Sequence, residues 1–153
     1  MKKLTITVLV IAAVTMLSLV VSGMGEPIRV TKDADVDRQL ADQLVGSVFQ
    51  SYRNFSIPSF MAIVSEDYSP DRTQLINTIG DSCYKTLIIN IDYFINKVMG
   101  GNGTIAVLFK WQKSVQNKST GRMISTEGKA TFVFKNQDGT WKLVRIQGRN
   151  PLI

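Results

Sequence analysis

Few residues of this chain combine the types and the spacing that catalysis requires. Cys83 is the only cysteine, and the chain contains no histidine that could activate its thiol. The sequence has neither a cysteine–carboxylate cluster with metal-ligand spacing nor a glycine-rich phosphate loop between a strand and a helix. We therefore predict no metal site and no cofactor, and we expect Cys83 to be a small buried side chain.

In four runs of residues every second position carries an apolar or aromatic side chain, which predicts β-strands with one apolar face. They are residues 87–96, 105–112, 129–135 and 141–146. Turn sequences separate them at residues 100–103, 117–121 and 136–139, and the last ends in a glycine that suits a short hairpin. Because consecutive strands are joined by turns, the four strands predict an antiparallel meander.

Three segments with helical spacing precede these strands. The first follows the acids of Asp33–Asp37, the second begins at Pro58, and the third has Ser69 as its N-cap and Pro70 as its first residue. Val64 falls in the second of these predicted helices. We therefore predict an α+β fold in which three N-terminal helices cover one face of a curved, four-stranded antiparallel sheet.

The N-terminal segment is typical of an export signal. Lys2 and Lys3 precede an uncharged run from Leu4 to Val21, and small residues follow before the first acid, Glu26. We predict a signal peptide at residues 1–25, which would stay as an anchor if it were not cleaved, a linker at 26–32 and one domain at 33–153. Whether the segment is cleaved or retained, the domain is predicted to be exported to a periplasmic or other extracytoplasmic space.

The charges are distributed unevenly along the chain. Residues 26–104 contain 7 basic and 10 acidic residues, whereas residues 105–153 contain 9 basic and 2 acidic residues. A basic sheet can attract anionic lipid head groups or an acidic partner protein, although a solvated, lysine-rich strand face is the commoner explanation of such a pattern. We do not expect a nucleic-acid partner, because basic and aromatic residues do not interleave on one loop or strand.

Several segments resemble the nuclear transport factor two-like (cone) superfamily, whose bacterial members include SnoaL-like and ketosteroid-isomerase-like proteins. The resemblance rests on the helix with Phe49 and Tyr52 and on residues 65–71, 106–111, 128–134 and 138–144. It covers nearly the whole predicted domain. It implies helices packed against a curved sheet, and it leaves the activity open, because this fold carries enzymes, binding modules and docking domains.

The face of the sheet beneath the helices is apolar and aromatic, which is the composition of either a ligand pocket or a filled core. The alternation places Leu87, Ile89 and Ile91 on this face. A hydrophobic small molecule is one predicted partner. The candidate pocket residues are Phe49, Tyr52, Tyr93, Phe109, Trp111, Phe132 and Arg145.

A ketosteroid-isomerase-like reaction is the enzymatic alternative that the resemblance implies. It would need an acid acting as a base and a hydrogen-bonding tyrosine inside the cone. Asp92 is the nearest strand acid, with Tyr93 and Tyr52 as the other weak candidates, but the alternation places Asp92 on the face opposite Tyr93. Dehydratase-like members would need a histidine, which the chain lacks.

The outer face of the predicted sheet carries more large apolar residues than a solvent-facing sheet needs. The candidate interface residues are Ile88, Phe94, Leu108, Lys110 and Val133, and Val144 and Ile146 share the face if no bulge intervenes. The resemblance makes a homodimer through this face a reasonable expectation. If Val98 lies opposite Thr104, Asp92 lies opposite Lys110 and offsets its charge there.

The leading hypothesis is therefore an exported, non-catalytic cone-fold domain that binds a hydrophobic small molecule or docks to an envelope protein. The first alternative is a small cofactor-independent isomerase, lyase or hydrolase. The second is an accessory domain that an uncleaved N-terminal segment holds at the membrane.

Overall fold

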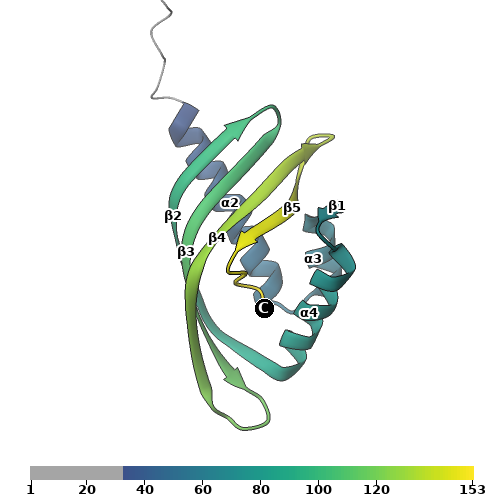
Figure 1. Ribbon diagram of the computed structural model, residues 1–153, viewed down its shortest axis with the longest axis vertical. Helices are drawn as coiled ribbons and strands as arrows, with labels where there is room; N and C mark the ends of the chain where they lie inside the picture. Colours follow the sequence, from purple (N-terminus) through teal and green to yellow (C-terminus); the bar gives the residue numbers. More distant parts are fainter. Residues whose placement is uncertain (1–32) are drawn as a thin grey trace, which may run out of the picture. The chain divides into compact units, whose positions relative to one another are not determined.

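The computed structural model describes residues 33–153, so the predicted signal peptide at 1–25 and linker at 26–32 lie outside the described residues. Three helices are present in this part of the chain: α2 (Asp33–Arg53), α3 (Ile57–Ile63) and α4 (Arg72–Lys85). The strands are β1 (Val64–Ser69), β2 (Thr86–Gly101), β3 (Thr104–Asn117), β4 (Met123–Gln137) and β5 (Thr140–Gly148). The long strands curve around α2 (Figure 1).

The helices begin at local sequence signals. Ser56 caps α3 by accepting a hydrogen bond from the Ser59 amide at 3.3 Å, and Pro58 lies in its first turn. Asp71 caps α4 by accepting from the Gln74 amide at 2.9 Å. The predicted cap at Ser69 was therefore wrong by two residues. Gly80 lies inside α4.

The sheet has five strands in the order β1-β5-β4-β3-β2, one more than predicted. The additional strand, β1, pairs in parallel with β5, with Val64 opposite Leu143. The prediction of a helix at Val64 was wrong because α3 ends one residue earlier, and Val64 already has extended dihedral angles of −84° and 128°. With only Val64 and Tyr68 as buried apolar residues, β1 is too short to show a period in the sequence.

Two of the three hairpins close with two-residue turns. Asn102 and Gly103 have φ angles of 51° and 70°, and Asp138 and Gly139 have φ angles of 53° and 83°. Positive φ at both central residues is typical of the turn that matches the twist of paired strands. The predicted turns at 100–103 and 136–139 are therefore present, and they are as tight as a hairpin allows.

Bulges in β2 change which of its side chains face the helices. One lies between Ile88 and Asn90, and another lies between Ile95 and Lys97. The alternation breaks at Ile89, so Leu87 and Ile89 are exposed, at 43% and 52%, and the prediction that they face the helices was wrong. Ile88 packs against the core instead, so its assignment to an outer interface was also wrong.

The predicted register of β2 and β3 was wrong because the strands pair up to a two-residue turn. Thr104 lies opposite Gly101 rather than Val98, and the bulge between Ile95 and Lys97 shifts the pairing beyond it by one residue. Asp92 lies opposite Gln112, and Lys110 lies opposite Phe94, so the predicted Asp92–Lys110 pairing is wrong. A bulge in β5 likewise turns Ile146 toward the core rather than toward the outer face.

Gly128 in β4 allows a tryptophan and an arginine to pack closely over the sheet. It lies opposite Trp111, whose indole Nε1 donates to the Arg149 backbone oxygen at 3.0 Å. A Cβ at position 128 would lie 3.0 Å from Trp111 Cζ2 and 2.9 Å from Arg149 Cδ. Both distances are shorter than van der Waals contact, so a larger residue here must displace one of the two side chains.

We predict that Gly128→Ala lowers the free energy of unfolding by about 1–3 kcal/mol, because the added methyl group overpacks this contact. Urea unfolding followed by tryptophan fluorescence measures the change. The matched control is Gly80→Ala in α4, where an added Cβ meets no atom within 4 Å. That control raises the free energy of unfolding by about 0.5–1 kcal/mol through helix propensity. Equal effects of the two variants would contradict the packing at Gly128.

Candidate functional site

The centre of the cone, the space between α2 and the concave face of the sheet, contains a cluster of aromatic rings. The Phe49 ring of α2 lies 5.9 Å from that of Phe109 and 5.8 Å from that of Phe132. The Phe109 and Phe132 rings are 4.8 Å apart and meet edge to face, a geometry that aromatic pairs prefer. Phe109 and Phe132 are 0% exposed, and Phe49 is 2% exposed.

This cluster occupies the place where the sequence predicted either a ligand pocket or a filled core. Five of the seven predicted pocket residues are buried in the core: Phe49, Tyr52, Phe109, Trp111 and Phe132. The Tyr93 ring borders the same cluster, 5.3 Å from the Phe49 ring and 6.1 Å from the Phe109 ring, whereas Arg145 lies elsewhere. Arg145 is exposed, opposite Val133, and donates to Ser69 Oγ at 3.4 Å, so its prediction as a pocket residue was wrong.

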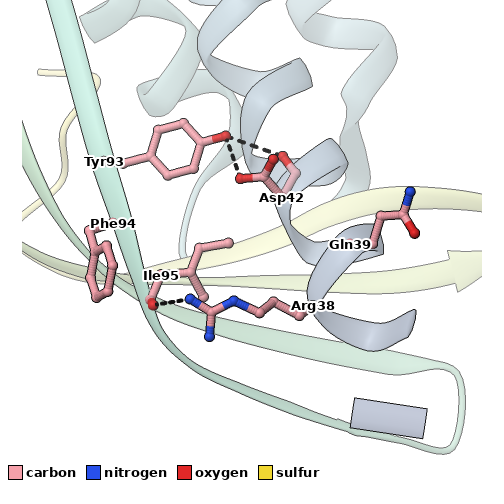
Figure 2. Close-up of a pocket in the computed structure, with 6 residues that line it drawn as sticks. All are labelled: Arg38, Gln39, Asp42, Tyr93, Phe94 and Ile95. Atoms are coloured by element: carbon pink, nitrogen blue, oxygen red, sulfur yellow. Dashed lines mark hydrogen bonds between the residues drawn. The ribbon is translucent and has the colours of Figure 1, made fainter. Parts of the chain in front are cut away.

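Tyr93 lies in a groove of about 380 Å³ between α2 and β2. Figure 2 shows its hydroxyl pointing at Asp42, to which it donates at 3.0 Å to Oδ1 and 3.3 Å to the backbone oxygen. Burial, together with the hydrogen bond and negative charge of Asp42, raises the pKa of Tyr93 to about 12. The hydroxyl therefore stays protonated and joins the helix to the strand.

Arginines of α2 contact the free edge of β2 in the same region. Arg38 Nη2 donates to the Ile95 backbone oxygen at 3.1 Å (Figure 2), and Arg53 donates to the Ile91 backbone oxygen. β2 is an edge strand that pairs only with β3, so its carbonyl groups that point away from β3 have no strand partner. The two guanidinium groups satisfy them and block the edge against strand addition. Sequence analysis missed Arg38 and Asp42, although their i, i+4 spacing places both on one helix face.

The enzymatic candidates are not brought together. Asp92 is exposed and bonds to Asn90, on the face of the sheet away from Tyr93. Tyr52 is buried near the other end of α2, where its hydroxyl lies 3.3 Å from Ser82 Oγ. In the described part of the cone, Asp42 in the groove is therefore the one acid that lies close enough to either tyrosine to act as a base with it.

A buried lysine was also missed by the sequence analysis. Lys113 is 4% exposed and follows Trp111 on the inner face of β3, a placement that the alternation Trp111, Lys113, Val115 could have predicted. Its Nζ donates to the Ile153 backbone oxygen at 3.2 Å and to the Tyr52 hydroxyl at 3.4 Å. Burial lowers the pKa of Lys113 to about 8, since removal from water disfavours the charged amine.

Cys83 lies close to this lysine. Burial raises the pKa of its thiol, partly offset by the positive charges of Lys118 and Lys113. The thiol is therefore mostly protonated at neutral pH and a weak nucleophile. The Lys113 amine, with Tyr52 and the Ile153 oxygen as its neighbours, is a buried cation without an acidic partner among the side chains that the structure describes.

The outer face of the sheet combines basic and apolar residues. Phe94 is 63% exposed and Met99 is 44% exposed. The predicted interface residues Leu108 of β3 and Val133 of β4 lie half-buried on this face. Lys110 is exposed on the same face of β3, which lies between β2 and β4. Four of the five predicted interface residues therefore share the outer face, and only Ile88 does not.

No group of three or more histidine, cysteine or acidic side chains is arranged to hold a metal ion in residues 33–153. Of the described helices, none has the length and apolar character needed to cross a bilayer.

Comparison with known proteins identifies the fold. No family model matches the sequence, and no curated protein is similar to it. A conserved protein from Planctomyces limnophilus is 12% identical with a TM-score of 0.65 over 75% of this chain and 99% of that one. A Salmonella enterica NTF2-like superfamily protein is 13% identical with a TM-score of 0.63, over 76% and 92% of the two chains.

A ketosteroid isomerase-like protein from Erwinia carotovora is 16% identical, with a TM-score of 0.60 over 79% of this chain and 99% of that one. Identities this low establish the fold and leave the activity open. The described chain therefore has the nuclear transport factor 2 (NTF2)-like cone fold, as the sequence resemblance implied.

We predict that replacing Lys113 with Met changes how stability depends on pH. The unfolded chain holds the Lys113 proton up to about its ordinary pKa of 10.5, whereas the folded chain releases it near 8. The unfolded state therefore binds more protons in this window, and the lysine's penalty on folding disappears as the pH rises. The stability advantage of Lys113→Met over the wild type should shrink by up to about 3 kcal/mol between these pH values.

Urea unfolding at a series of pH values measures this difference. Subtracting the two proteins cancels the contribution of Tyr93, whose raised pKa acts on stability in the opposite direction at high pH. Cys83 and Tyr52 interact with Lys113 itself, so their change on its removal is part of the measured difference. A difference that stays constant across the window would show that the amine is solvated in the folded protein.

Proposed function

We propose that this protein is a non-catalytic interaction domain whose filled cone supports a docking surface on the outer face of the sheet. The observation that carries the proposal is the packing of Phe49, Phe109 and Phe132, with ring centroids 4.8–5.9 Å apart and exposed fractions of 0–2%. Rings this close leave no space between them for a substrate.

The separation of the polar candidates supports the same proposal. A proton-transfer enzyme needs its acid and base within hydrogen-bond reach of one bound molecule. Here Asp92 lies outside the cone, Tyr52 lies beside Lys113, and Tyr93 is bonded to Asp42 in the groove. The ketosteroid isomerase-like neighbour shares the fold, and its name alone assigns no reaction to this chain.

The outer face offers what a docking surface needs. Exposed Phe94 and Met99 supply apolar area, and the half-buried Leu108 and Val133 extend it across the middle strands. An envelope protein and a second copy of this chain both stay predicted partners. Export also stays a prediction, because residues 1–25 lie outside the described residues.

We predict opposite outcomes for two phenylalanines of the same sheet. Phe109→Ala lowers the free energy of unfolding by about 3–5 kcal/mol, because it opens a cavity in a packed cluster. Phe94→Ala is the matched control on the exposed face, and it changes stability by less than about 0.5 kcal/mol. Thermal and urea unfolding of residues 32–153 measure both.

Native mass spectrometry of the same wild-type protein completes the test. The expected spectrum has the mass of the polypeptide alone, with no apolar molecule bound inside the cone. A stoichiometric apolar ligand, or a Phe109→Ala variant as stable as the wild type, would contradict the filled cone and with it the proposed function.

A further inference from the structure

We propose that the outer sheet face docks onto an anionic lipid surface. This inference rests on the proposed function and names the chemistry of the partner. It is carried by an excess of positive charges around exposed apolar side chains.

The register of the strands brings six basic residues to this face, against the two acids Asp92 and Glu127. The basic residues are Lys97, Lys110, Lys129, Lys135, Lys142 and Arg145. Within strands β2–β5, the basic residues on this face therefore outnumber the acids by four, and Glu66, Asp67 and Asp138 lie near Lys142 at the β1 edge of the sheet.

Four of these lysines form two like-charged pairs. Lys110 lies directly opposite Lys129, and Lys135 lies directly opposite Lys142. Like charges in such positions destabilise a sheet. Among the side chains described in residues 37–153, the one ion pair joins Lys85 and Asp81 on α4, at 3.8 Å. Lys142 is partly compensated, because its ammonium group donates to the Ala62 backbone oxygen and it lines a pocket with Glu66, Asp67 and Asp138. The Lys110–Lys129 pair lies one row from Asp92 and Glu127, and an anionic partner would balance the charge that remains on this face.

Exposed apolar groups lie within this basic set. Phe94 is the direct cross-strand neighbour of Lys110, so Phe94, Lys110 and Lys129 form one row across three strands. Met99 lies farther along β2, opposite Ala106. An aromatic ring flanked by lysines can enter the head-group region of a bilayer while the ammonium groups contact lipid phosphates.

The type and distribution of the charges favour lipid over an acidic protein. Five of the six basic residues are lysines, which act as flexible point charges, whereas recognition of individual carboxylates favours the rigid fork of arginine. The charges extend over four strands of one face. The uncharged run at residues 4–21 would hold the domain close to a membrane if it were retained.

Vesicle binding tests the proposal. Residues 32–153 form one compact unit that contains the described core, so this fragment can be studied without the apolar N-terminal run. We expect it to cosediment with vesicles of phosphatidylcholine and phosphatidylglycerol, to bind pure phosphatidylcholine vesicles far less, and to dissociate as salt is added.

Variants locate the surface. Lys110→Gln with Lys129→Gln should lower the partition coefficient about 25-fold, at about five-fold for each lysine. Lys85→Gln with Lys118→Gln removes the same charge away from the outer face and should lower it less than about three-fold. Phe94→Ser should lower it several-fold while leaving the thermal unfolding midpoint unchanged.

Three results would overturn the proposal: no cosedimentation with anionic vesicles, equal losses in the two double-lysine variants, or unchanged binding by Phe94→Ser. Equally tight binding to soluble polyglutamate would instead assign the face to an acidic protein. Each of these results can occur with the cone still filled, so they are distinguishable from failure of the proposed function.

Discussion

The contact between the Phe49 ring of α2 and the Phe109 and Phe132 rings of the sheet is the interaction on which the rest of the structure depends. It joins a helix from the N-terminal half of the domain to the two central strands, which are distant in sequence. The sheet must curve around α2 for these rings to meet, and the β-bulges in β2 and β5 are the local irregularities that such curvature requires. The two-residue turns at 102–103 and 138–139 then close the β2–β3 and β4–β5 hairpins and set where their pairing begins.

A filled centre also explains where the polar groups lie. The polar ends of Tyr93 and Lys113 are held by different groups of α2, Asp42 in the first case and Tyr52 in the second. Neither group contacts the other, so the cone has no shared polar site at its centre. Glycine at position 128 extends the close packing to Trp111 and Arg149, at the end of β5. Binding is then left to the surface, where the charges are unevenly distributed.

Sequence reasoning predicted the parts of the fold that depend on regular alternation. The inner residues of β3 and β4, among them Phe109 and Phe132, were assigned correctly because those strands pair without interruption. The assignment failed at Leu87, Ile88 and Ile89, since one extra residue in a bulge reverses the side-chain faces and nothing in the local sequence marks it.

Other features depend on contacts between distant residues. β1 exists because β5 offers it a partner, and six residues with two buried apolar side chains carry no periodic signal of their own. The Asp42–Tyr93 bond joins residues 51 positions apart, so it could not be predicted from spacing. Lys113 could have been found, because it continues the inner alternation of a strand that was otherwise correctly predicted.

Nuclear Overhauser spectroscopy of the aromatic rings tests the filled cone most directly. Selective labelling of phenylalanine would resolve ring protons of Phe49, Phe109 and Phe132, whose centroids lie 4.8–5.9 Å apart. The structure predicts strong cross-peaks among these three rings and no cross-peak from any of them to water. Water cross-peaks at these rings, or missing contacts between Phe49 and the two strand residues, would contradict the account.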